Sequence, residues 1–246
     1  MTGQNKEWNS SAKILKELLG LEYKPVALSC LKEPIFTSTD KKIRICRAIL
    51  DAGKGESLQI GKNTNACFGA SWHLGFRKIT NPEVAKMVKK FVVEGEKLFS
   101  SYEALDNLIT QMGEAPDNSG SFFVLAPMDE CEFPPQLAIF ICDALAACRL
   151  LTLATFIDGI MPKIKIGGPT CRMSVIYPLL SGETNLSFYD YTARKICNVD
   201  KDKLIITIPY VKIPGIIESV NKCSAGTAKI GFDPEFRTFL QKNLAT

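Results

Sequence analysis

The sequence predicts an α/β (or α+β) protein in which one or more mixed sheets are flanked by helices. Short apolar runs of strand length alternate along the chain with longer segments whose apolar residues recur at helical spacing. Gly, Pro, Asn and Asp residues separate these segments and mark their ends. This alternation favours a sheet with at least some parallel strands. At 246 residues, the chain is long enough to form a sizeable core.

The composition is that of an ordinary globular protein. Hydrophobic residues make up 46% of the chain and charged residues 23%, and 30 basic against 26 acidic side chains give a net charge of +4. Because the basic residues are spread along the chain, we expect no nucleic-acid binding. The longest apolar stretch, residues 144–157, contains Arg149 and is too short to span a membrane. Since the start of the chain is polar, we expect a cytoplasmic protein without membrane association.

The first half of the chain contains clear helix and strand signals. A first helix has its leucines on one face and ends at Gly20, and a second carries Ile45 and stops at Gly53. Asn81-Pro82-Glu83 is a strong helix start, because it combines a cap, a fixed φ and an acid near the positive end of the helix dipole. Further helices are expected at 66–74 and 102–112, and strands at 25–31, 58–61 and 122–126.

The second half follows a similar pattern. Asp143 caps a long apolar helix that we expect to end at Gly159. Thr170 is a good N-cap for a helix that begins at Cys171 and reaches residue 180. Strands are expected at 136–141, 163–166, 185–191 and 204–208, a helix at 214–220, and a C-terminal helix at 233–244.

These two halves can be aligned with each other. Cys46-Arg47 matches Cys148-Arg149, and Cys67 and Cys171 each follow an Ile-Gly pair and a polar turn. We therefore expect a single compact domain over residues 1–246, built of two degenerate repeats at about 21–133 and 134–222. A pseudo-twofold axis would relate the repeats and bring Cys67 and Cys171 together, although they are 104 residues apart in sequence.

The cysteines are the residues most suggestive of chemistry. Nine are present, and because the number is odd and no secretory signal is seen, disulfides are not expected. The remaining interpretations are buried apolar filler, metal ligands and reactive thiols. A single histidine, His73, excludes histidine-rich metal sites.

Cys67 and Cys171 stand in the first turn of predicted helices, where free N–H groups and the helix dipole favour a thiolate. Cys46 also lies near a helix start and precedes Arg47. These three thiolates could bind an iron–sulfur cluster and leave one iron open. They could instead bind zinc, with a fourth ligand from Cys30, Cys142 or Cys148. No CxxC motif supports either assignment, so core filling remains the alternative.

Three other features could contribute to a site. The turn Gly167-Gly168-Pro169-Thr170 precedes a helix and could bind an anion, although it is equally a capped tight turn. His73 is six residues beyond Cys67 and could act as a proton donor or ligand. Arg194 follows an aromatic, acidic segment and could bind a carboxylate or phosphate, or form a plain salt bridge.

The order of these motifs resembles the ArCR family of uncharacterised proteins (domain of unknown function 169), common in anaerobic archaea and bacteria. The resemblance covers about residues 18–220 and rests on the following motifs: Cys46-Arg47-Ala48, Asn65-Ala66-Cys67-Phe68-Gly69-Ala70, Val124-Leu125-Ala126-Pro127-Met128, Cys171, Tyr177-Pro178-Leu179-Leu180-Ser181-Gly182, Ala193-Arg194-Lys195 and Ile208-Pro209-Tyr210. It implies a role for Cys46, Cys67 and Cys171 ahead of the other six cysteines. It implies no particular reaction.

The leading hypothesis is a cytoplasmic metal-binding protein that holds an iron–sulfur cluster through Cys46, Cys67 and Cys171. An open iron would bind a small anion or sulfur-containing substrate, with Arg194 or His73 nearby. One alternative is a metal-free small-molecule-binding module that uses the Gly-Gly-Pro-Thr turn. Another is an enzyme with Cys67 or Cys171 as nucleophile. A homo-oligomer is compatible with all three hypotheses.

Overall fold

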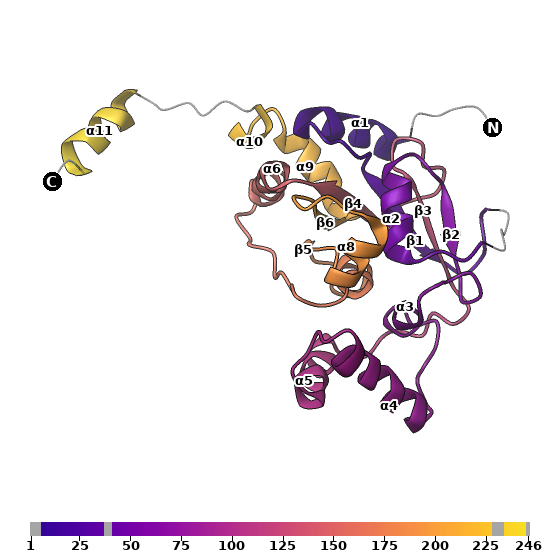
Figure 1. Cartoon of the computed structure of the whole chain (residues 1–246). Helices are drawn as coiled ribbons and strands as arrows, with labels where there is room; N and C mark the ends of the chain where they lie inside the picture. Colours follow the sequence, from indigo (N-terminus) through magenta and orange to yellow (C-terminus); the bar gives the residue numbers. More distant parts are fainter. Residues whose placement is uncertain (1–5, 37–40, 228–233, 245–246) are drawn as a thin grey trace.

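The computed structural model describes residues 6–36, 41–227 and 234–244, and six strands within them form one sheet (Figure 1). The strand order is β2-β3-β1-β4-β6-β5. The strands are β1 (Val26–Leu31), β2 (Leu58–Ile60), β3 (Phe122–Pro127), β4 (Leu137–Cys142), β5 (Asn185–Ser187) and β6 (Leu204–Pro209). Helices flank this sheet, which confirms the predicted fold class.

Helices pack on both faces of the sheet. The α1 face is covered by α1 (Glu7–Leu19), α6 (Ala144–Thr155), α9 (Ile213–Ser219) and the short α10 (Ser224–Thr227). The α2 face is covered by α2 (Ile45–Gly53), α3 (Phe68–His73), the continuous helix η2 (Arg172–Ile176) and α7 (Tyr177–Ser181), and α8 (Tyr191–Cys197). A short 3-10 turn, η3 (Tyr210–Lys212), joins β6 to α9.

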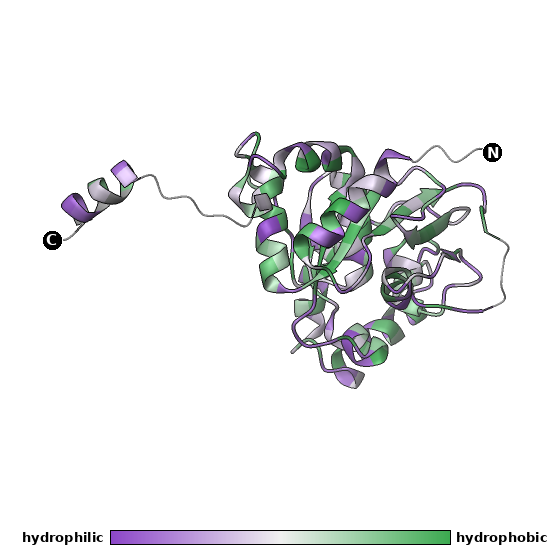
Figure 2. Ribbon diagram, turned by 90° about the horizontal axis from the view of Figure 1, so that it is seen from above, coloured by the Kyte–Doolittle hydropathy of each residue, from purple (hydrophilic) through white to green (hydrophobic). Residues whose placement is uncertain are grey.

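The long strands are mostly apolar because both faces of the sheet are covered by helices. In β1, Val26 and Leu28 contribute to the core on the α2 face, whereas Ala27 contributes to the core on the α1 face. All six residues of β4 are buried. Figure 2 shows hydrophobic colouring concentrated in the sheet and on the helix sides that face it. The sheet is therefore the middle layer of a three-layer arrangement.

The expectation of parallel pairing was wrong, because all five strand pairings in the described residues are antiparallel. β1 and β2 do run in the same direction, but β3 lies between them and is antiparallel to both. β6 separates β4 from β5 in the same way. Each half is thus a split strand-helix-strand unit, in which the later strand inserts between the first two.

The strand order is symmetric about the central β1–β4 pair, as two repeats would require. The helices do not follow this symmetry. α2, which follows β1, covers one face, whereas α6, which follows β4, covers the opposite face. An axis that exchanges two antiparallel neighbours runs normal to the sheet and would keep both helices on one face. The structure therefore does not confirm the internal duplication, which stays a prediction.

Residues 82–112 form a helical lobe that extends away from the sheet (Figure 1). The lobe consists of α4 (Pro82–Lys90), η1 (Phe91–Gly95) and α5 (Tyr102–Met112). Its predicted caps are present, since the Asn81 side chain accepts a hydrogen bond from the Glu83 N–H. Within these helices only Leu105 is buried.

Several predicted boundaries need correction. No strand forms at 163–166, where the backbone of Lys165 instead pairs with the side-chain amide of Asn185. The strand expected at 185–191 ends at residue 187, because Asp190 caps α8, a helix that the sequence reading missed. The helix capped by Asp143 ends at Thr155 rather than at Gly159.

The C-terminal helix α11 (Pro234–Leu244) lies apart from the sheet in Figure 1. Asp233, with which we expected this helix to start, lies outside the described residues. In the part of the chain that the structure describes, no helix combines the length and apolar character that a membrane span requires.

Candidate functional site

Five cysteines lie on the α2 face of the sheet, and one of them, Cys30, packs against the core from β1. Cys46, Cys171 and Cys197 belong to the buried core there, and Cys67 packs against it. We refer to these four residues as the thiol cluster. They come from α2, the loop before α3, the start of the η2 helix and the end of α8. The three cysteines selected from the sequence thus lie on one face of the sheet, and Cys197, which was not among them, lies there too.

Cys67 is the N-cap of α3, and its sulfur accepts a hydrogen bond from the Ala70 N–H at 3.4 Å. The Arg44 guanidinium donates to the same sulfur at 3.7 Å. The Asn65 side chain holds the capping turn, because its amide nitrogen donates to the Cys67 carbonyl at 2.6 Å. Two donors therefore place positive charge density beside a half-buried sulfur.

Cys171 lies in the first helical turn, as predicted, but it is buried. Burial raises the pKa of its thiol, and the neighbouring Cys67 and Asp190 raise it further, while backbone hydrogen bonds at the helix start lower it. Burial is the largest of these effects. At Cys171 burial thus outweighs the helix start, contrary to the expectation of a thiolate.

Cys46 and Cys197 form a close pair, with their sulfur atoms 3.8 Å apart. The hydrogen bond between them, followed by burial, raises the pKa of Cys46. The same bond lowers the pKa of Cys197, with help from Arg47. The pair therefore holds one proton more tightly than the other. Both residues are buried, with exposed fractions of 9% for Cys46 and 2% for Cys197.

Asp190 ties together the segments that carry Cys171 and Cys197. One of its carboxylate oxygens accepts hydrogen bonds from the Thr170 N–H at 2.9 Å and the Thr170 hydroxyl at 2.8 Å. The other oxygen accepts from the Ala193 N–H at 2.8 Å and caps α8. Two helix starts thus share one carboxylate, which fixes their spacing.

The turn Gly167-Gly168-Pro169-Thr170 was a candidate anion-binding site. The Thr170 N–H at the start of the helix already bonds a carboxylate, that of Asp190. The turn is as predicted, with Gly167 at a positive φ of 94°. The negative charge that this helix start attracts is therefore supplied by the chain itself.

Tyr189 adds an unusual polar group beside the thiol cluster. Its hydroxyl is buried and has no hydrogen-bond partner among the described residues. The pKa of Tyr189 is raised by burial first and then by the nearby Cys197 and Cys46 thiols. Buried hydroxyls in native proteins almost always have a partner, so this one is left for a bound molecule or water.

His73 lies near Arg172, which directly follows Cys171 in the chain. Burial, and then the Arg172 charge, lower the pKa of His73 to about 4, so its imidazole is neutral near pH 7. Arg172 is 4% exposed and donates to the carbonyl oxygens of Met112, Gly113 and Glu114 at 2.6, 3.1 and 2.7 Å. Arg172 thus joins the thiol cluster to the helical lobe.

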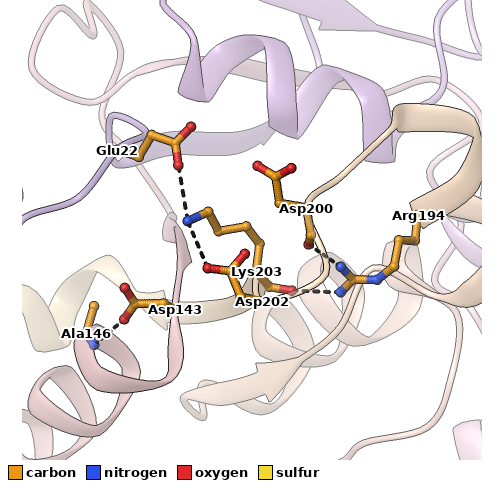
Figure 3. A network of polar contacts seen from close by, with 7 residues as sticks. All are labelled: Glu22, Asp143, Ala146, Arg194, Asp200, Asp202 and Lys203. Atoms are coloured by element: carbon orange, nitrogen blue, oxygen red, sulfur yellow. Dashed lines mark hydrogen bonds and ion pairs between the residues drawn. The ribbon is translucent and has the colours of Figure 1, made fainter.

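Arg194 does not serve the role that we proposed for it. Its guanidinium donates to the carbonyl oxygens of Asp200 and Lys203, which fixes the turn between α8 and β6 (Figure 3). The Lys203 ammonium in turn pairs with Glu22 and Asp202. The Arg194 guanidinium donates hydrogen bonds to backbone carbonyl oxygens and so stabilises the turn. It is therefore not free to bind a carboxylate or phosphate through these N–H groups.

The other cysteines are not part of the thiol cluster. Cys142 belongs to the core on the α1 face, and Cys148 is exposed. Cys30 lines a cavity of about 370 Å³, together with Asn118, Gln136 and apolar side chains of β4 and α7. None of these three therefore supplies the fourth zinc ligand that we considered. Within the described residues, no three side chains of His, Cys, Asp or Glu are arranged to hold a metal ion.

Comparisons with known proteins agree with the resemblance seen in the sequence. The family model described as uncharacterised ArCR matches residues 14–219. An uncharacterized protein of Methanocaldococcus jannaschii is 25% identical over 223 residues, which cover 87% of this chain and 94% of that protein. No solved structure matches the chain. The chain belongs to the ArCR family.

Proposed function

We propose that the thiol cluster binds an iron–sulfur cluster through Cys46, Cys67 and Cys171. The single observation that carries the proposal is that these three cysteines, distant in sequence, meet on one face of the sheet. Cys171 contributes to the raised pKa of Cys46, and Cys67 contributes to the raised pKa of Cys171, in each case after larger effects that include burial. Cysteine thiolates are the usual ligands of iron–sulfur clusters.

The unpartnered Tyr189 hydroxyl supports this proposal. A buried donor without a partner costs about 1–3 kcal/mol, so its presence beside Cys46 and Cys197 favours a bound acceptor there. The sulfide or thiolate of an iron–sulfur cluster is such an acceptor, because hydrogen bonds to these sulfurs are common in such sites. Three protein ligands would leave one iron open for a small anion or sulfur-containing substrate.

An iron–sulfur cluster is favoured over zinc. Structural zinc needs four ligands around one ion, and the described residues provide no such group. The ligands of a cluster bind separate iron atoms and are spread more widely.

The test is to purify the full chain without oxygen, record its visible spectrum and quantify iron, sulfide and zinc. We expect brown protein with iron and sulfide in similar amounts. Cys46→Ser, Cys67→Ser and Cys171→Ser should each lose most of the iron and the visible absorption. Cys148→Ser is the matched control, because Cys148 is exposed and outside the thiol cluster, and it should keep both.

Circular dichroism of each variant separates lost binding from lost folding. Tyr189→Phe should remain folded and shift the visible spectrum, because the substitution removes only the buried hydroxyl. Folded, colourless protein without iron, even after anaerobic reconstitution with ferrous iron and sulfide, would refute the proposal. Fast alkylation of Cys67 alone in such metal-free protein would instead favour a thiol-nucleophile enzyme.

A further inference from the structure

We propose that Cys46 and Cys197 form a reversible disulfide that regulates the thiol cluster. The observation that carries this inference is the 3.8 Å separation of the two sulfur atoms. A disulfide bond is about 2.05 Å long, so the sulfurs need to approach each other by less than 2 Å.

The two residues lie on neighbouring helices that pack together. Cys46 stands in the first turn of α2, and Cys197 is the last residue of α8. Asp190 caps the start of α8 and Arg194 fixes the turn after it, so both ends of this seven-residue helix are held in place. The helix that carries Cys197 is therefore held beside α2, which carries Cys46.

The chemistry requires an oxidant, for which we propose a peroxide. One thiolate of the pair attacks a peroxide oxygen, the O–O bond breaks, and a sulfenic acid and water form after protonation. The second thiol then attacks the sulfenic sulfur, the S–S bond forms, and a second water leaves. In total, two thiols lose two electrons and two protons to hydrogen peroxide, which becomes two waters.

The consequence for the proposed iron site follows from the ligand set, and this part rests on the proposed function. Cys46 cannot bind iron while its sulfur is bonded to Cys197. Oxidation would therefore prevent assembly of the iron–sulfur cluster, and reduction by a dithiol would restore it. The disulfide itself does not depend on iron and can be tested without it.

The experiment uses the full chain, reduced, treated with a chelator and then exposed to stoichiometric hydrogen peroxide. After remaining thiols are blocked with N-ethylmaleimide, tryptic digestion without reductant should release residues 45–47 (Ile-Cys-Arg) linked to residues 196–201 (Ile-Cys-Asn-Val-Asp-Lys). Dithiothreitol should separate the two peptides. Cys197→Ala should lose the linked species, whereas Cys148→Ala should retain it.

Two outcomes would overturn the inference. The first is folded wild-type protein in which peroxide leaves Cys46 and Cys197 as free thiols. The second is a disulfide that joins other pairs, such as Cys67 and Cys171, in preference.

The regulatory part has a separate readout, which is iron uptake by the oxidised and the re-reduced chain. We expect at least tenfold less uptake by the oxidised form. Equal uptake by the two forms refutes regulation, whereas no uptake by either form refutes the proposed function and leaves the disulfide result intact.

Discussion

The sulfur atoms of the thiol cluster differ in what surrounds them. Cys67 accepts hydrogen bonds from a backbone N–H and from Arg44 and is the most accessible of the four. Cys171 is enclosed, and its proton is retained because burial penalises the thiolate. A soft metal or an electrophile arriving from solvent would therefore meet Cys67 first, and binding deeper in the cluster would release protons from the buried thiols.

The first prediction concerns His73 and pH. Its folded-state pKa of about 4 lies below the ordinary value of 6.5, because burial and the Arg172 charge disfavour the imidazolium. The unfolded chain then binds more protons than the folded chain between these two values. Stability should be fully present above pH 6.5 and should fall by about 3 kcal/mol as the pH decreases to 4.

The measurement is direct because His73 is the only histidine in the chain. In untagged protein, the imidazole resonances of a proton NMR titration report this residue alone. We expect a midpoint below pH 5. In urea unfolding, His73→Gln should flatten the stability profile between pH 6.5 and 4.5 relative to wild type. A midpoint near 6.5 would contradict the burial argument.

For single residues, the sequence identified three of the four cysteines of the thiol cluster, because the signals for a helix start are local. It missed Cys197, which stands at the end of an unpredicted helix and becomes notable only through its distance to Cys46. The sequence also suggested Arg194 as a ligand for an anion. It could not show that the Arg194 guanidinium donates hydrogen bonds to backbone carbonyl oxygens instead. Side-chain type predicts what a residue can bind, whereas tertiary contacts decide whether it is available.

Among the helices, the one that begins at Cys171 contains a π-helical segment, and this segment has an identifiable cause. Pro178 has no N–H and cannot donate to the Ser174 carbonyl one turn earlier. The preceding residues adopt a π-helix, and the Tyr177 N–H donates to the Arg172 carbonyl. The Thr207 hydroxyl on β6 donates to the Ser174 carbonyl at 2.8 Å instead. The helix is thereby held against the sheet.

The second prediction tests whether the Thr207 hydroxyl replaces the missing backbone donor of the Ser174 carbonyl. Thr207→Val keeps the side-chain shape and removes the hydroxyl, so the buried Ser174 carbonyl loses its donor, and unfolding in urea should show a loss of about 1–3 kcal/mol. Pro178→Ala supplies a backbone N–H near the same carbonyl. In a double-mutant cycle, Thr207→Val should therefore cost less in the Pro178→Ala background. Equal costs in both backgrounds would show that the two features are independent.

Element prediction from the sequence succeeded where a local signal was present and failed where pairing decided the structure. The Asp143 and Asn81 caps form as expected. Residues 163–166 have a strand-like pattern, but the main chain of Lys165 bonds the Asn185 side chain instead of a strand. Short apolar runs carry no information about their partners, so a strand that lacks one cannot be recognised from sequence alone.

For the whole molecule, alternation of strands and helices predicted the α/β class but not the strand order. Two strands of each half do share a direction, and the third strand then inserts between them. That insertion depends on pairing between residues about a hundred positions apart in the first half, such as Val26 with Pro127. Periodicity within a segment contains no record of such distant pairing, so the antiparallel sheet could not be derived from it.

The last prediction concerns how the helical lobe is attached. With Leu105 its only buried helix residue, the lobe has little core of its own, and the Arg172 guanidinium bonds three carbonyls where α5 ends. Arg172→Met should leave these carbonyls without their donor and destabilise the protein by about 2–4 kcal/mol. Hydrogen exchange should accelerate in α5 by more than in β4, because the lobe opens before the sheet.

The control variant is Lys195→Met, which alters an exposed lysine near Tyr191. It should change neither the stability nor the exchange rates. Uniform acceleration across α5 and β4 in Arg172→Met would show instead that the lobe and the sheet unfold as one unit, with Arg172 as part of their common core.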